Sequence, residues 1–354
     1  METINMIKDL SNCYGAPGFE DNVLEVVNNY KGNLSFKKDS MMNCYLNLAK
    51  RDNNKMTVML DAHLDEVGFM VQSIDERGLI NFIPLGGWVV NNIPAHLVMI
   101  KTTEGKYVKG IVTSKPPHFM TAAEREKKLE ISDMQIDVGA TSRNEVINEF
   151  KIDVAAPIVP FVDFEYNEKS GIMMGKAFDN RLGCAAVIEA LKKLENKNLS
   201  INVIGALAAQ EEVGTRGAQI TSNTIKPDIA IVFEGSPADD IYTDKFTMQS
   251  GLNYGPQIRH RDNSYVSHHR FITFAKSIAN KNNITCQNTV RVAGGTNAGK
   301  IHLSNEGVPT LVLGIPTRYV HTHHCYASFK DFQNTVSLAV EIIKNLNSDI
   351  INSF

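Results

Sequence analysis

Apolar residues recur at two different spacings along the chain, and the spacing changes from one region to the next. Within residues 2–31 they return every three or four positions, which predicts two amphipathic helices separated by the turn residues 14–18. A continuous apolar run at 56–61 predicts a strand buried on both faces, and a shorter strand is expected at 44–48. We therefore expect an α/β domain to begin before residue 66.

The pattern changes between about residues 68 and 162, where short segments alternate apolar and polar positions. Turn residues such as Gly78 and Gly105 separate these segments, which is typical of a small β-barrel or sandwich. One short helix is expected to interrupt it at 142–150. The sequence thus predicts a β-rich domain, residues 67–165, inserted into the α/β domain.

From about residue 171 the chain alternates strands with helices, which predicts a mostly parallel sheet covered by helices on both faces. The expected elements are a helix at 180–194, strands at 201–210 and 228–233, a helix at 267–279, a strand at 310–315 and a helix at 331–345. This region continues the opening segment. The α/β domain is therefore predicted to be discontinuous, with residues 1–66 and 166–354.

Composition narrows the classes of function. The 36 basic and 39 acidic residues give a formal net charge of -3, which argues against nucleic acid as the main partner. No apolar run approaches the roughly 20 residues that a membrane span needs, and the first residues carry acids rather than a signal-peptide core. The five cysteines are scattered and form no CxxC pair, so we expect a reducing, cytoplasmic location without disulfides.

Acidic and histidine side chains stand at or just beyond the ends of the predicted strands, the edge at which open α/β sheets bind ligands. His63 ends the first strand, and imidazole binds zinc through a nitrogen whose tautomer a carboxylate such as Asp65 can fix. Glu211 and Glu212 follow the next strand, and adjacent buried carboxylates are costly unless protonated, paired or metal-bound. One of this pair can bind a metal while the other faces a bound water.

Three further positions have simpler explanations when each is taken alone. Asp179 stands where the helix at 180–194 needs an N-cap, and Glu234 would suit a solvated turn. His321, His323 and His324 would suit a plain surface. Together, however, two imidazoles and three carboxylates, one of them bridging, supply three protein ligands to each of two metal ions and leave room for a shared water.

Taken in order, these motifs resemble the glutamyl/deblocking aminopeptidase family, which includes the tetrahedral (TET) peptidases and some relatives labelled cellulases. The resemblance covers nearly the whole chain. It rests on the motifs APGFE (16–20), DAHLDEVGFMV (61–71), DVGATSRNEV (137–146), KAFDNRLGC (176–184), QEEVGTRGA (210–218), FEGSPADD (233–240), GGTNAG (294–299) and RYVH (318–321). It implies an aminopeptidase that removes N-terminal residues from peptides.

The resemblance also implies two divalent metal ions per subunit, zinc or cobalt, with manganese as a third candidate. Carried over position by position, the ligands are Asp179 for both ions, His63 and Glu234 for one, and Glu212 and His321 for the other. Glu211 becomes the general acid/base, and Asp65 orients His63. The cations would acidify a bridging water, whose proton Glu211 passes to the leaving amine.

The fold implied by the resemblance is a phosphorylase/hydrolase-like mixed sheet flanked by helices, with an inserted β-barrel dimerisation domain. Self-association from a dimer up to a tetrahedral dodecamer is expected, with peptides as the other partners. Departures from the family pattern include Glu234 where aspartate is frequent, Asn297 where aspartate is usual, and the segment 322–325 in place of a Ser-Pro segment with a nearby glutamate. We expect Asn297 to alter recognition of the substrate, and His321 rather than its neighbours to be the ligand.

Two other functions compete with the aminopeptidase. A glycoside hydrolase would use paired carboxylates, but it leaves His63 and His321 without a role, and the single tryptophan, Trp88, is expected to pack in the barrel rather than bind sugar. A catalytically silent binding protein of the same fold is the other alternative. All the ligand positions and Glu211 keep usable side chains, which favours the enzyme.

Overall fold

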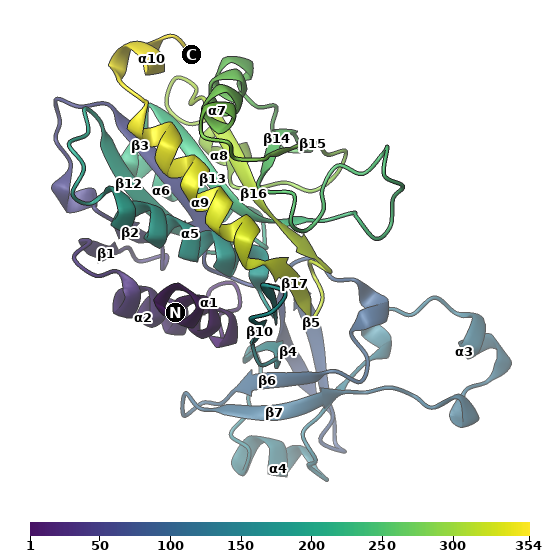
Figure 1. Ribbon diagram of the computed structural model, residues 1–354. Coiled ribbons are helices and arrows are strands. Elements are labelled where there is room, and N and C mark those ends of the chain that lie inside the picture. The colour runs from purple at the N-terminus through teal and green to yellow at the C-terminus, as the bar shows by residue number, and fades with distance from the viewer.

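A computed structural model describes residues 1–354 and divides the chain into a large mixed sheet between helices and a closed β-barrel (Figure 1). The path through the 11-stranded sheet is β1 (Phe36–Lys38), β2 (Cys44–Leu46), β12 (Asn202–Ala208), β3 (Thr57–His63), β13 (Ile229–Pro237), β16 (Thr310–Arg318), β17 (Cys325–Ser328), β11 (Ile172–Gly175) and β10 (Glu165–Asn167). Two more strands, β14 (Gln257–Arg261) and β15 (Gln287–Val290), pair with each other beside β16.

The four central strands run parallel, so their carboxyl ends meet at one edge of the sheet. Helices cover both faces, as the alternation of strands and helices in the sequence predicts. One face carries α1 (Glu2–Asn12), α2 (Asp21–Tyr30), α5 (Phe178–Leu194), α7 (His269–Lys281), α9 (Phe329–Lys344) and α10 (Ser348–Asn352), and the other carries α6 (Arg216–Ile225) and α8 (Ala298–Ile301). No helix is long and apolar enough to cross a membrane.

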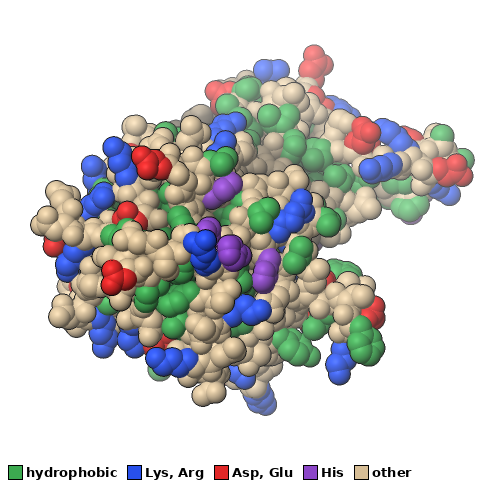
Figure 2. Space-filling model, turned by 90° about the horizontal axis from the view of Figure 1, so that it is seen from above, with side chains coloured by type: hydrophobic (Ala, Val, Ile, Leu, Met, Phe, Trp, Pro, Cys, Tyr) green, Lys and Arg blue, Asp and Glu red, His purple; other side chains and the backbone are tan.

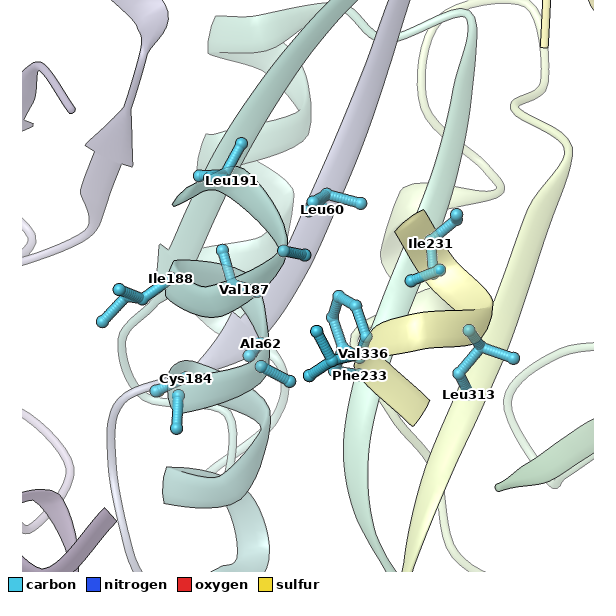
Figure 3. Packing of buried hydrophobic residues seen from close by; sticks show 14 of the residues in the cluster. Leu60, Ala62, Cys184, Val187, Ile188, Leu191, Ile231, Phe233, Leu313 and Val336 are labelled. Carbon is cyan, nitrogen blue, oxygen red and sulfur yellow. The ribbon is translucent and has the colours of Figure 1, made fainter. Parts of the chain in front are cut away.

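Successive side chains of the central strands alternate between two cores. Leu60 and Ala62 of β3 join the larger cluster, which holds α5 and α9, whereas Met59 joins the cluster under α6 and α8. Figure 3 shows Leu60, Ala62 and Phe233 in one buried cluster with Val187 of α5 and Val336 of α9. This two-sided burial explains why β3 reads as a continuous apolar run.

The inserted region closes into a six-stranded antiparallel barrel with its own core. Its strands, in spatial order, are β4 (Gly68–Ile74), β5 (Ile80–Leu85), β8 (Ile136–Asp137), β7 (Tyr107–Val112), β6 (Leu97–Lys101) and β9 (Pro157–Pro160). The expected short helix is α4 (Arg143–Asn148), and α3 (Ala122–Glu126) lies on an arm that projects from the barrel (Figure 1). The predicted α/β class with a β-barrel is confirmed.

Several elements differ from the sequence prediction. Strand β13 continues to Pro237, so Glu234 lies inside the strand rather than in a turn after it. The helical cap at α5 is Ala177, not Asp179, because Asp179 and Asn180 have non-helical dihedral angles. Helix α6 and the strand pair β14–β15 were not predicted, because α6 has no long apolar run and both strands are short.

Candidate metal centre and active site

The parallel strands and helix α5 bring all the predicted site residues to one edge of the sheet. His63 is the last residue of β3, and Glu234 lies on the neighbouring strand β13. Glu211 and Glu212 follow β12 after two intervening residues, and His321 follows β16 after a left-handed turn in which Tyr319 and His321 both have φ of 63°. The shared strand direction gathers these residues, which are distant in sequence.

The carboxylate of Asp179 lies between the two histidines. Its Oδ1 is 3.1 Å from His63 Nε2, and its Oδ2 is 3.5 Å from His321 Nε2. Each oxygen thus faces a different imidazole. This arrangement is compatible with a carboxylate shared by two cations.

Each histidine has a second carboxylate beside it. Glu234 Oε1 is 3.4 Å from His63 Nε2, and Glu212 Oε2 is 3.6 Å from His321 Nε2. The ligand atoms of His63, Asp179 and Glu212 all lie within 4.8 Å of one another, close enough to hold a metal ion. The structure therefore contains two imidazole–carboxylate groups that meet at Asp179.

The charges of the site suit cations. Burial raises the pKa of Glu212 and of Glu234 well above the ordinary value, and the Asp179 carboxylate adds to both shifts. Burial alone would raise the pKa of Asp179 too, but the hydrogen bonds from the two histidines lower it. Glu212 Oε1 and Glu234 Oε2 are buried without a hydrogen-bond partner. Divalent cations would neutralise this excess of carboxylates and give the unpaired oxygens a partner.

Glu211 is the remaining carboxyl of the cluster. Its Oε2 lies 3.9 Å from His63 Nε2, farther than either Asp179 or Glu234, and burial raises its pKa to about 7. A carboxyl with that pKa accepts and donates protons near neutral pH, as a general acid/base must.

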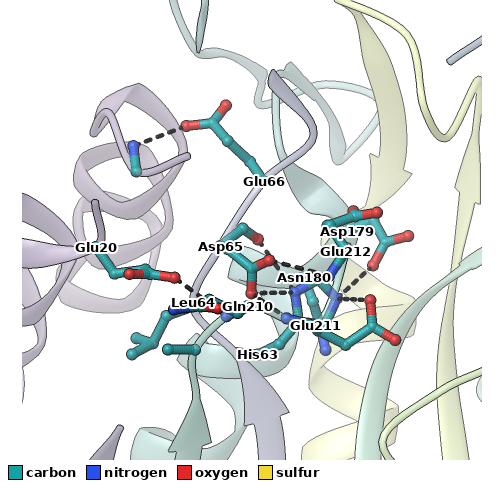
Figure 4. Close-up of polar contacts among 12 residues, drawn as sticks. Glu20, His63, Leu64, Asp65, Glu66, Asp179, Asn180, Gln210, Glu211 and Glu212 are labelled. Carbon is teal, nitrogen blue, oxygen red and sulfur yellow. Dashed lines mark hydrogen bonds and ion pairs between the residues drawn. The ribbon is translucent and has the colours of Figure 1, made fainter. Parts of the chain in front are cut away.

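Asp65 supports this cluster mainly through backbone contacts (Figure 4). Its Oδ1 accepts the N–H of Glu211 at 2.9 Å, and its Oδ2 accepts the N–H of Glu212 at 3.0 Å. His63 Nδ1 lies 3.1 Å from the carbonyl oxygen of Asp65 and 3.5 Å from its carboxylate. Asp65 therefore touches both His63 and the glutamate pair.

A glycine allows β13 to approach Asp179 closely. A Cβ at Gly235 would stand 2.5 Å from the carbonyl oxygen of Phe178 and 2.6 Å from the Cα of Asp179, closer than any side chain permits. Asn180 fastens the same junction, because its amide donates to Phe233 O at 2.8 Å and accepts from Gly235 N at 3.2 Å. These contacts hold the residues on either side of Glu234, and they therefore fix the distance between Glu234 and Asp179.

The ligand cluster opens into a cleft of about 820 Å³. The barrel contributes one wall: Val89 N donates to His321 O at 3.3 Å, and a Cβ at Gly87 would lie 3.3 Å from His321 Nδ1. Trp88 stacks on Phe69 of the barrel at 4.5 Å, as expected, and also lines the cleft.

Two arginines in the cleft were missed by sequence reasoning. Arg259 donates to Ser236 Oγ at 2.6 Å and pairs with Asp262 at 3.2 Å. Arg291 donates to the carbonyl oxygen of Pro237 and has no carboxylate partner. Neither residue follows a long apolar strand. The search for polar side chains at the ends of predicted strands therefore did not find them.

Of the residues that depart from the family pattern, Glu234 and Thr322 line the cleft, whereas Asn297, His323 and His324 lie away from it. His323 is buried against the barrel, where it stacks on His96 at 4.1 Å, and His324 lies 5.5 Å from the same ring. Asn297 is also buried, and its amide donates to Asp61 at 2.8 Å. Neither His323 nor Asn297 lines the cleft.

A second hollow, of about 730 Å³, lies beside α7 and shares no residue with the cleft. His260, Arg261, His269 and Lys276 give it a basic lining without an acidic side chain. Figure 2, which views the molecule from above, shows histidines gathered with lysine and arginine near the middle of that face. The hollow is separate from the carboxylate-rich edge of the sheet.

Several known proteins that are similar to this chain in sequence are aminopeptidases. The family model described as M42 glutamyl aminopeptidase matches residues 43–338. The glutamyl aminopeptidase of Lactococcus lactis is 30% identical over 352 residues, which cover 99% of this chain and 98% of the relative. The lysyl aminopeptidase of Pyrococcus furiosus is 30% identical over 293 residues, which cover 82% of each protein.

Solved structures of two TET peptidases have the same fold as this chain. The TET aminopeptidase of Thaumarchaeota archaeon SCGC AB-539-E09 superposes with a TM-score of 0.94 at 33% identity, covering 99% of this chain and 98% of its own. The TET1 peptidase of Pyrococcus horikoshii gives 0.86 at 27% identity, with coverage of 97% and 100%.

Fold, metal-binding geometry and relatives together define a metal-dependent aminopeptidase. The chain belongs to the M42 glutamyl aminopeptidase family. The predicted peptide hydrolase is thus confirmed, and the glycoside hydrolase is not supported.

Proposed function

We propose that this aminopeptidase holds two divalent cations per subunit, zinc or cobalt, with manganese as a third candidate. The proposed ligands are Asp179 for both, His63 and Glu234 for one, and Glu212 and His321 for the other. The observation that carries the proposal is the Asp179 carboxylate, whose two oxygens face two different imidazoles. Mixed imidazole and carboxylate donors suit zinc and its neighbours.

The protein groups have distinct tasks in peptide hydrolysis. The bound cations would polarise the scissile carbonyl and acidify water. Glu211 takes a proton from the attacking water and delivers it to the leaving amine, a task that its place beside His63 and outside both proposed ligand sets suits. Asp65 fixes the direction of Glu211 through the backbone amide that it accepts.

We further propose a preference for substrates with an acidic N-terminal side chain. Arg259 is anchored through Ser236, two residues beyond Glu234 on β13, which puts its guanidinium beside the metal ligands. Arg291 supplies a second guanidinium, and because it has no carboxylate partner it is free to pair with an acidic side chain of a substrate. This favours the substrate named for the Lactococcus lactis relative over that of the Pyrococcus furiosus relative.

Substrate preference is tested with glutamyl, leucyl and lysyl coumarin amides. The wild type should have its highest kcat/KM on the glutamyl substrate. Arg291→Ala should lower that value by about 10- to 100-fold, the effect of losing a charged hydrogen bond, while leucyl turnover stays unchanged. A wild-type preference for lysyl substrate would refute the acidic preference.

The barrel, residues 67–165, is proposed as the dimerisation domain, with assembly from a dimer up to a tetrahedral dodecamer. Support comes from the Pyrococcus horikoshii TET1 peptidase, which can assemble into a tetrahedron or a large octahedral shell. A cytoplasmic location is proposed from the five free cysteines. Light scattering on the intact protein would measure the assembly.

The central experiment is metal removal and return. A chelator should abolish activity, and zinc or cobalt should restore it with two ions bound per chain. Elemental analysis of the reactivated protein measures the stoichiometry. Full activity with one ion per chain would contradict the two-ion site while leaving the aminopeptidase class intact.

A further inference from the structure

One buried carboxyl near the site has no cationic partner and no role in the chemistry described above. Glu20 immediately precedes α2 and is fully buried. It ends the APGFE motif, which contributes none of the proposed ligands. Its contacts lead directly to the turn that carries the general acid/base.

Glu20 Oε1 accepts two backbone hydrogen bonds, from Gly18 N at 2.9 Å and from Gln210 N at 3.1 Å. Gln210 has a φ of 57°, a left-handed conformation that non-glycine residues rarely adopt. It directly precedes Glu211. The Gln210 amide thus has its acceptor on the residue that precedes α2, 190 positions away in the sequence.

Carboxylate oxygens accept from each backbone amide of the turn at residues 210–212. The amide of Gln210 points to Glu20, and the next two amides point to Asp65 (Figure 4). Three successive N–H groups are therefore held by two carboxylates from different elements. A change in the acceptor at Gln210 alters the turn immediately before Glu211.

We propose that Glu20 is a positioning residue for Glu211: its carboxylate oxygen holds the Gln210 amide in the left-handed turn and so aims the acid/base carboxyl at the substrate. The proposal rests on the assignment of Glu211 as the acid/base residue. Glu20 itself touches neither the ligand cluster nor the cleft.

The test compares Glu20→Gln with Glu20→Leu. Glutamine keeps an acceptor oxygen at the same distance, so its kcat should stay within about twofold of the wild type. Leucine has a similar size but no acceptor. Its kcat should fall about 10- to 100-fold, the effect of removing one fixed contact in an active site, while KM and metal content stay unchanged.

A role in folding alone would lower the folded fraction of Glu20→Leu but not the kcat per metal-loaded site. Wild-type kcat in Glu20→Leu would overturn the proposal, and so would a Glu20→Gln variant as slow as Glu20→Leu, because charge rather than an acceptor would then be needed.

If Glu20→Leu fails to fold, the double variant Glu20→Leu/Gln210→Gly replaces it, since glycine adopts the left-handed turn without a clamp. It should recover folding and most of the lost kcat. A folded double variant with the full loss of kcat would overturn the proposal. Full activity in Glu211→Gln would instead refute the acid/base assignment, so the two failures are distinguishable.

Discussion

The amide of Asn297 donates a 2.8 Å hydrogen bond to the carboxylate of Asp61, and both residues are buried. Asp61 lies two residues before His63 on the same strand. Burial raises the pKa of Asp61 to about 8, although the hydrogen bond from Asn297 opposes the shift. The departure of Asn297 from its family pattern is thus matched by a neighbouring acid and does not change the cleft.

Asn297→Asp should destabilise the fold, because it places two buried carboxyls against each other and removes a donor. The expected loss is about 1–3 kcal/mol of unfolding free energy. Adding Asp61→Asn restores a donor and an acceptor, so the double variant should regain most of the stability. Urea unfolding of the wild type, of Asn297→Asp and of the double variant measures these stabilities. Equal stability of Asn297→Asp and the double variant would show that Asp61→Asn does not compensate for the change at Asn297.

Glu211→Gln should lower kcat by about 10²–10⁴-fold, because it removes the proton carrier. Metal content should not change, since Glu211 completes neither proposed ligand set. Elemental analysis beside steady-state kinetics tests both statements. A parallel loss of metal and activity would make Glu211 a ligand and exchange its role with that of Glu212.

His321→Ala should remove metal and activity, because His321 alone of the three nearby histidines faces Asp179 and Glu212. His323→Ala is the matched control. It should keep both ions and lose roughly 1–3 kcal/mol of stability, since its ring fills a buried space beside His96 and Trp88. Metal loss in His323→Ala with full occupancy in His321→Ala would reverse the assignment.

Glu20→Gln should stabilise the protein at pH 8 but not at pH 4.5. Burial, followed by the charge of Asp65, raises the pKa of Glu20 from 4.5 to about 7. Between these values the folded chain binds more protons than the unfolded chain, so stability falls as pH rises. The cost above pH 7 is at most about 3 kcal/mol, and glutamine removes it.

Melting temperatures at the two pH values measure this effect. Glu25→Gln, on the exposed side of α2, is the control and should show no such difference. An equal change in melting temperature at both pH values would show that Glu20 does not titrate in this range.

The sequence predicted most of what depends on local pattern. The buried run ending at His63 and the turn residues of the barrel are set by neighbours in the chain, so their spacing reveals them. The candidate ligands were predicted because strand ends in a parallel sheet share an edge. The family resemblance then distinguished Glu212 from Glu211, which spacing alone left open.

Other features depend on tertiary contacts that no local pattern contains. Arg259 and Arg291 reach the cleft only because β14 and β15 pair beside β16. The link from Glu20 to Gln210 joins residues 190 positions apart. Asp179 was open to interpretation as a cap because its non-helical backbone follows from packing against Gly235.

His321 has contacts on two sides. Asp179 at the start of α5 lies on one side, and Val89 and Gly87 of the barrel lie on the other. A cation bound by the proposed ligands Asp179 and His321 would also restrain the segment around His321, which contacts the barrel. Coupling between two events is reciprocal, so if metal binding favours docking of the barrel, docking favours metal binding by the same coupling free energy. The inserted domain would then be coupled energetically to the proposed metal site, and its orientation would influence how firmly the ions are held.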